Sequence, residues 1–156
     1  MNIDIYTDGG CSGNPGPGGW AYVIIEGKHI IDEKWGAEDN TTNNRMEITA
    51  ALEGLNRSLE LGLKPDAITV HTDSQYLQKG ITQWIKNWKK NNWKTSAKEA
   101  VKNQELWISL DTVTSYLPVT WKWVKGHAGN EFNERCDRMT QEAIASIKKK
   151  EKNKQG

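Results

Sequence analysis

A run of glycines and prolines between Gly9 and Gly19 places the tightest constraint on how this chain can fold. Ahead of it, apolar and polar residues alternate over residues 2–7, which predicts a β-strand exposed on one side, with Asp8 at its end. The glycines permit positive φ and close backbone approach, whereas Pro15 and Pro17 restrict φ. The stretch is therefore either a stiff hairpin connection or a loop that lets a bulky anionic polymer approach Asp8. It lacks the Gly-Lys-Ser/Thr ending of a Walker phosphate loop.

Size and composition favour one domain without a membrane segment. The chain has 156 residues, and its 36% hydrophobic content includes eight tryptophans. No run approaches the ~20 apolar residues of a membrane helix, and residues 1–4 lack the basic, apolar start of a signal peptide. Cys11 and Cys136 have no spacing that suggests zinc. We therefore expect a cytoplasmic protein with two free thiols, and a monomer by default.

Charge is distributed unevenly along the chain, although the formal net charge is only +1. Residues 86–102 contain six lysines against one glutamate, and residues 148–156 contain five lysines against one glutamate. The rest of the chain is correspondingly acidic. Two basic segments on an acidic body suggest a polyanionic partner, while the acidic body argues against indiscriminate coating of nucleic acid.

The order of the predicted elements indicates an α/β fold. Apolar periodicity and turn residues predict strands over residues 20–25, 29–35, 67–72 and 119–124, a loop over 36–40, and helices over residues 42–61, 74–79, 81–88, 103–117 and 131–149. The first three strands should form an antiparallel meander. The strand at 67–72 follows a helical crossover and should therefore lie parallel to the first. We expect a five-stranded mixed sheet flanked by helices.

Four carboxylates have positions that suit metal binding, although each also has an ordinary structural explanation. Asp8 and Asp73 follow strands, at the edge where open α/β sheets bind ligands. Asp73 also suits a helix N-cap, Glu47 suits the first turn of a helix, and Asp137 suits an exposed helix face. Clustered carboxylates repel one another unless a cation compensates, and all-oxygen ligands select Mg²⁺ or Mn²⁺. Two such ions about 3.5–4 Å apart would support phosphodiester hydrolysis.

Further candidates lie in the first basic segment and in the loop after the last strand. His127 stands between small residues that cannot fix it by packing, which favours a proton carrier or phosphate contact over a surface residue. Trp84 and Trp88 recur at helical spacing, which predicts that both rings lie in the core. The lysines beyond them either form a solvated face or make residues 81–102 a handle that grips phosphates.

Six blocks of the sequence together resemble a bacterial ribonuclease H of the type 1 class, ribonuclease HI. They are Tyr6-Thr7-Asp8-Gly9, Gly13-Asn14-Pro15-Gly16, Thr42-Asn43-Asn44-Arg45-Met46-Glu47, Thr72-Asp73-Ser74-Gln75-Tyr76, Lys125-Gly126-His127-Ala128-Gly129 and Asn133-Glu134-Arg135-Cys136-Asp137. The match runs in order over nearly the whole chain. It implies a ribonuclease H-like fold and an endonuclease that cuts the RNA strand of an RNA/DNA hybrid, leaving 5′-phosphate and 3′-hydroxyl ends.

The resemblance also implies roles for matching residues. The metal-binding carboxylates would be Asp8, Glu47, Asp73 and Asp137, holding two Mg²⁺ ions when substrate is bound, with Mn²⁺ as a substitute. His127 would assist proton movement and product release. Hybrid contacts are expected from Cys11, Asn14, Asn43, Asn44 and Gln75 and, on the handle, from Trp84, Lys89, Lys90 and Lys94. The 2′-hydroxyls in the minor groove distinguish RNA from DNA. The implied position of Trp84 near the DNA backbone conflicts with its predicted place in the core.

The sequence departs from the family pattern at two places. Asn130-Glu131-Phe132 replaces a turn that often contains proline, and the lysine-rich tail is longer than expected. We predict a single catalytic domain over residues 1–147 and a disordered tail over 148–156 that either adds phosphate affinity or has no effect. Rival functions are another metal nuclease, such as a DNA resolvase, and a binding module without catalysis. The Asn-rich helix start and the handle argue against the first, and the intact carboxylate set argues against the second.

Overall fold

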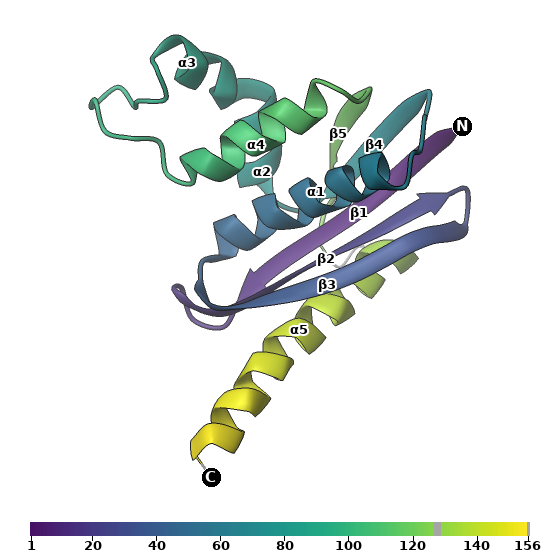
Figure 1. Cartoon of the computed structure of the whole chain (residues 1–156), viewed down its shortest axis with the longest axis vertical. Helices are drawn as coiled ribbons and strands as arrows, with labels where there is room; N and C mark the ends of the chain where they lie inside the picture. The colour runs from purple at the N-terminus through teal and green to yellow at the C-terminus, as the bar shows by residue number, and fades with distance from the viewer. Residues whose placement is uncertain (127–128, 156) are drawn as a thin grey trace.

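The computed structural model describes residues 1–126 and 129–155, whose course Figure 1 shows. The strands are β1 (Asn2–Cys11), β2 (Gly16–Glu26), β3 (His29–Thr41), β4 (Ala67–Thr72) and β5 (Val119–Trp123). The helices are α1 (Asn43–Glu60), α2 (Gln75–Lys79), a π-helical turn (Gly80–Trp84), α3 (Ile85–Lys90), α4 (Gln104–Thr114) and α5 (Glu131–Gln155). The sheet order is β3-β2-β1-β4-β5. Strands β1 to β3 pair antiparallel, and β4 and β5 pair parallel, as predicted.

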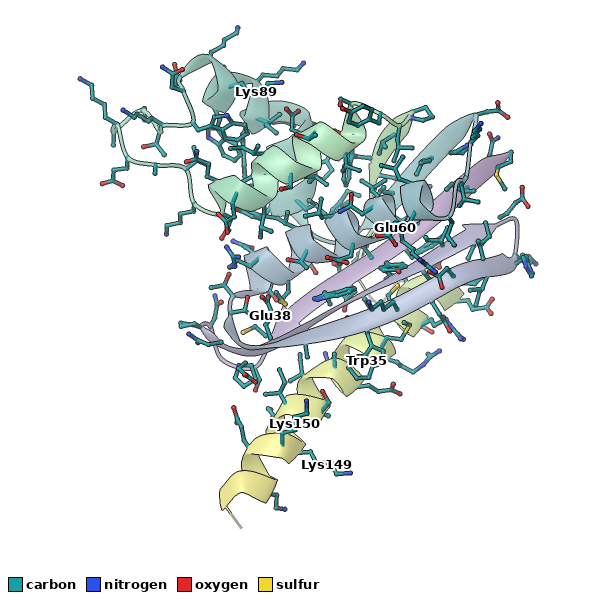
Figure 2. All side chains as sticks on the ribbon, viewed as in Figure 1. Trp35, Glu38, Glu60, Lys89, Lys149 and Lys150 are labelled. Carbon is teal, nitrogen blue, oxygen red and sulfur yellow. The ribbon has the colours of Figure 1, made fainter. Side chains whose placement is uncertain are left out.

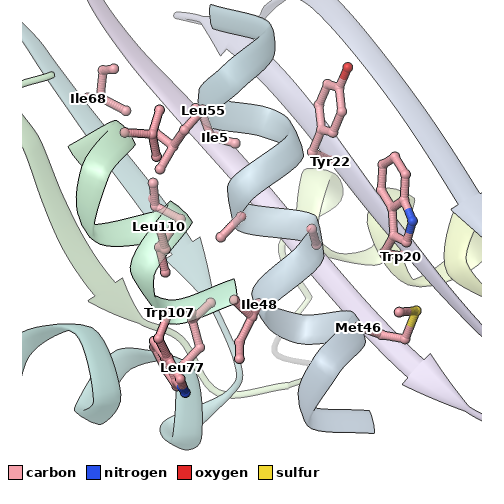
Figure 3. Packing of buried hydrophobic residues seen from close by; sticks show 14 of the residues in the cluster. Ile5, Trp20, Tyr22, Met46, Ile48, Leu55, Ile68, Leu77, Trp107 and Leu110 are labelled. Atoms are coloured by element: carbon pink, nitrogen blue, oxygen red, sulfur yellow. The ribbon is translucent and has the colours of Figure 1, made fainter. Parts of the chain in front are cut away.

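Both faces of the sheet are covered, because β2 is apolar on both sides. Trp20, Tyr22 and Ile24 point into the core under α1 and α4, part of which Figure 3 shows. The alternate residues of β2 pack on the opposite face with Cys136 of α5. Tyr6 joins that second cluster and is only 8% exposed. The prediction that β1 is exposed on one side is therefore wrong, since α5 covers the face that its polar residues suggested was open.

The first three strands are longer than their sequence pattern predicted. Strand β1 continues through Gly9 and Gly10, which pair with Trp20 and Gly19 of β2. Strand β3 continues through residues 36–40, where a loop was expected, and ends at Thr41. Backbone pairing with β2 extends these strands through residues whose side chains give no strand signal.

A buried tryptophan explains why a glycine stands at position 80, inside a continuous helical segment. Gly80 has helical φ and ψ of −59° and −52°, and the chain continues through a π-helical turn into α3. A Cβ atom at Gly80 would overlap the ring of Trp107, which is fully buried on α4. The predicted separation of two helices at Gly80 is therefore wrong. The glycine makes room for the largest fully buried side chain of the molecule's described part.

Helix α5 continues to Gln155, beyond the end predicted at Lys149 and through the tail that we expected to be disordered. The residues after Ile147 are mainly lysine, glutamate and glutamine, which have good intrinsic helix propensity. In Figure 1 this part of α5 extends past the sheet. In the described part of the chain, no helix is both long and apolar enough for a membrane span.

Candidate active site

Asp8 lies within β1 rather than at its end, because the strand continues to Cys11. It pairs with Ala21 of β2, and its backbone carbonyl accepts a hydrogen bond from the Thr140 hydroxyl at 3.4 Å. The neighbouring strand and α5 therefore both position the backbone of Asp8. The side chain remains partly exposed.

Glu47 lies beside Asp8 because a glycine allows α1 to approach β1. A Cβ atom at Gly9 would overlap the backbone of Met46 and Glu47. The Gly9 N–H donates a hydrogen bond to the Glu47 carboxylate, which is only 4% exposed. Helix α1 begins at Asn43 with Thr42 as its N-cap and has no acidic residue in its first turn, so Glu47 lies at the start of the second turn and not in the first as predicted. Tertiary packing, rather than the helix dipole, accounts for its position.

Asp73 follows β4 directly, as predicted, but it does not cap the next helix. The N-cap of α2 is Ser74, whose hydroxyl accepts a hydrogen bond from the Leu77 N–H at 3.1 Å. The backbone carbonyl of Asp73 accepts a hydrogen bond from the Trp123 indole N–H at 3.0 Å. A Cβ at Gly126 would lie 3.2 Å from the Asp73 carboxylate. The Asp73 carboxylate lies close to those of Asp8 and Glu47.

These three carboxylates form a compact cluster, with one oxygen from each lying within 4.8 Å of the others. Burial, followed by the charge of Asp73, raises the pKa of Asp8 from 3.8 to about 7. Burial and the charges of Asp8 and Asp73 raise the pKa of Glu47 well above its usual value. Such repulsion is relieved by a cation, and an all-carboxylate donor set fits a hard divalent ion. The residues present therefore fit a metal of the Mg²⁺ class.

Asp137 lies next to this cluster but is not among its three close members in the described part of the chain. It stands on α5, where its negative charge contributes to the raised pKa of Asp8. Asp8 and Asp137 line a hollow of about 400 Å³, together with Ser12, Gln141 and Lys148. The sequence did not single out Ser12 or Gln141, and it marked Lys148 only as part of the basic segment 148–156. Gln141 and Lys148 repeat at helical spacing from Asp137, which was the available signal.

His127 lies outside the described residues, so its predicted role stays a prediction. The nearby departure from the family pattern does have a structural account. The side-chain oxygen of Asn130 accepts hydrogen bonds from the N–H groups of Phe132 and Asn133 at 3.0 and 3.1 Å. Asn130 thereby satisfies the first turn of α5, which carries Asp137.

Most of the candidate minor-groove residues lie where the β1–β2 loop meets the start of α1. The Asn43 N–H donates a hydrogen bond to the Asn14 side-chain oxygen at 3.2 Å. Asn14 and Asn44 line a groove of about 580 Å³ below the handle. Gln75 is exposed at the start of α2. The Cys11 thiol contacts the carbonyl oxygens of Gly16 and Thr41, both at 3.2 Å, so this candidate also stabilises the hairpin.

The handle combines a packed aromatic base with exposed lysines. Trp88 packs on Trp107, with ring centroids 5.4 Å apart, whereas Trp84 is 36% exposed. The predicted core position is therefore wrong for Trp84 and only partly right for Trp88. Lys90 and Lys94 are exposed, and so is Lys89, which forms an ion pair of 3.0 Å with Asp111. The structure thus leaves Trp84 accessible.

Comparison with known proteins identifies relatives over nearly the whole chain. The RNase H family model matches residues 1–145. A ribonuclease H from Treponema denticola is 52% identical, with the alignment covering 94% of this chain and 99% of the relative. A ribonuclease H from Hydrogenovibrio crunogenus is 54% identical, with coverage of 94% and 98%. These matches confirm the resemblance found in the sequence.

Solved structures agree with this relationship. LC9-RNase H1, described as a type 1 RNase H with the type 2 active-site motif, is 29% identical and has a TM-score of 0.82 over 94% of this chain and 73% of that one. LC11-RNase H1 in complex with RNA/DNA hybrid has a TM-score of 0.72 over 92% of this chain and 97% of that one; at 24% identity it supports the fold alone. With its fold, its carboxylate cluster and its sequence relatives in agreement, this chain belongs to the RNase H family.

Proposed function

We propose that this chain hydrolyses the RNA strand of RNA/DNA hybrids at the cluster of Asp8, Glu47 and Asp73, leaving 5′-phosphate and 3′-hydroxyl ends. The observation that carries the proposal is the close approach of three carboxylates, within 4.8 Å, in a member of the RNase H family. A binding module would gain nothing from bare carboxylates facing a polyanion. LC11-RNase H1, which shares the fold, has been solved in complex with RNA/DNA hybrid, in agreement with the proposed substrate.

The three clustered carboxylates and Asp137 would hold Mg²⁺, with Mn²⁺ as a substitute and two ions when substrate is bound. When bound, these ions supply activation of water and charge stabilisation at the leaving oxygen. The protein's own contribution is to fix the carboxylates. The Gly9 N–H donates a hydrogen bond to Glu47, and Asp73 directly follows β4, next to Asp8 and Glu47. His127 would move the proton that the leaving oxygen requires.

Hybrid recognition would use two surfaces beside the cluster. Asn14, Asn43, Asn44, Gln75 and Cys11 would contact the minor groove, where 2′-hydroxyls mark the RNA strand. Trp84 and the handle lysines Lys89, Lys90 and Lys94 would contact the backbone of the hybrid. The handle's exposed lysines and the Asn14–Asn43 hydrogen bond support this division. We also propose that the protein is a monomer and that it works in the cytoplasm. Its two free thiols fit a reducing compartment.

The deciding experiment presents one end-labelled RNA as a hybrid with DNA, as duplex RNA and as a single strand, first with Mg²⁺ and then with chelator. Cleavage of the hybrid alone, dependent on Mg²⁺, is expected. Asp8→Asn should abolish cleavage while keeping hybrid binding, because it removes a negative charge that faces the substrate. Binding of the hybrid without cleavage under either Mg²⁺ or Mn²⁺ would make the chain a recognition module.

A further inference from the structure

The C-terminal part of α5 is a lysine-rich helix that contributes nothing to the core. Ile147 is the last buried residue of α5 within the described side chains, and Lys148, Lys149, Lys150 and Lys152 are all exposed. Figure 2 labels Lys149 and Lys150 on the portion of α5 that extends beyond the sheet. Packing therefore gives no reason for this charged extension.

One face of this extension is continuous with the candidate active site. Asp137, Gln141, Ile144 and Lys148 all line the hollow that contains Asp8. Their spacing of three or four residues places them in one row along the helix. Eleven residues span about 16 Å, and side chains in a helix lean toward its N-terminus, so Lys148 leans back toward Asp137. The row thus runs from the carboxylates to a cation.

Lys152 continues this row four positions beyond Lys148. Among the ion pairs of the described residues, none contains Lys148 or Lys152. The two lysines stand four positions apart on the helix, where like charges repel. A bound anion would relieve that repulsion.

Lys150 has different surroundings, although it is only two positions away from Lys148. It lines a separate groove with Trp35, Glu38 and Asp39 of β3, so two carboxylates lie on its side of the helix. The labels of Figure 2 place Lys150 on the part of α5 below β3. Lys150 and Lys149 carry the same charge as Lys148 but do not line the hollow that contains Asp8, which makes the pair a matched control.

We propose that Lys148 and Lys152 bind backbone phosphates of the RNA strand, extending the substrate-binding surface from the carboxylate cluster along α5. This inference rests on the proposed function, because the RNA strand is the one whose phosphate enters the cluster. At about 3.4 Å per nucleotide, the 16 Å between Asp137 and Lys148 corresponds to phosphates roughly three to five nucleotides from the cut.

Binding measurements on two double variants test the proposal. Fluorescence anisotropy with a labelled RNA/DNA hybrid, in the uncleaving Asp8→Asn background, gives Kd between 50 and 200 mM salt. Lys148→Gln/Lys152→Gln should weaken binding about tenfold at 50 mM and reduce the salt slope by about 1.5. Lys149→Gln/Lys150→Gln, with the same charge change, should weaken binding less than threefold. Glutamine keeps the helix propensity of lysine, and far-UV circular dichroism confirms that α5 is retained.

Cleavage kinetics distinguish this inference from the proposed function. With Asp8 intact, the Lys148→Gln/Lys152→Gln defect should appear in KM rather than in kcat. The KM defect should also disappear when the hybrid is shortened so that only two base pairs remain on one side of a central cleavable run. Equal weakening by both double variants, or an unchanged salt slope, overturns the inference. If the unsubstituted chain cuts no hybrid, the proposed function fails whatever the lysine variants do.

Discussion

Replacing Asp8 by asparagine should stabilise the metal-free protein above pH 7, although it should abolish activity. Folding raises the pKa of Asp8 to about 7, compared with 3.8 for an ordinary aspartate. A carboxyl group whose pKa is raised by folding costs no stability below the lower of these values. The cost grows as pH rises between these two values, because the unfolded chain loses the proton at a lower pH than the folded chain does. The cost is complete above about pH 7. Asparagine carries no such cost.

Burial is the larger cause of the raised pKa of Asp8, and the spacing of the carboxylates sets the size of the second cause, their mutual repulsion. At 4.8 Å, the upper limit of the distances between the three carboxylate oxygens, two unit charges repel by about 3.5 kcal/mol at an effective dielectric of 20 and by about 1 kcal/mol in water. Asp8 is partly exposed, which places its surroundings between these limits. We therefore compare the free energy of unfolding of Asp8→Asn with that of the unsubstituted protein at each pH. This difference should favour Asp8→Asn by about 1–3 kcal/mol more at pH 8 than at pH 4.

Urea unfolding in EDTA, followed by tryptophan fluorescence at several pH values between 4 and 8, measures this difference. The urea midpoint should shift while the slope of the unfolding free energy against urea stays constant. Asp39→Asn, an exposed substitution on β3, serves as the control and should show no pH-dependent gain. Adding Mg²⁺ at pH 8 should stabilise the unsubstituted protein more than Asp8→Asn. A stability difference that is the same at pH 4 and pH 8 would refute the reasoning.

Three further variants test the fold and the substrate contacts. Gly9→Ala should reduce the cleavage rate at least 100-fold and lower stability by about 2 kcal/mol or more, because the added methyl group overlaps the backbone at Met46; kinetics and urea unfolding measure both. Trp107→Ala should cost about 3–5 kcal/mol in urea unfolding, since the ring is fully buried. Lys90→Ala/Lys94→Ala should weaken hybrid binding and lower the salt slope by roughly one per lost phosphate contact; an unchanged slope would remove the handle from the interface.

Local sequence pattern predicted the element types and the mixed sheet well, because amphipathic periodicity and caps are encoded within a few neighbouring residues. Helix α1 begins with Thr42 as its N-cap, at the start predicted for the helix over residues 42–61, and the strand at 67–72 lies parallel to β1. The pattern failed where a distant segment decides the outcome. Strand β3 extends over residues 36–40 only because β2 supplies its hydrogen-bond partners. Gly80 was predicted to separate two helices. The reason for a glycine there is the fully buried ring of Trp107, which lies 27 positions away in sequence.

The candidate site divides in the same way. The residues Asp8, Glu47 and Asp73 were identifiable from the sequence, because their neighbours form motifs that resemble those of a known family. Their environment was not, and the clearest example is Glu47, which the sequence placed in the first turn of a helix and the structure buries against Gly9.

The sequence by itself therefore determined the family, the order of the elements and the identity of the carboxylates. The tertiary structure decided that three of these carboxylates lie within 4.8 Å, that Trp84 is accessible and that Lys148 shares a hollow with Asp8. The physical reason is that periodicity and capping are local properties of a chain. Burial, charge repulsion and the room left by a glycine depend on residues that only folding brings together.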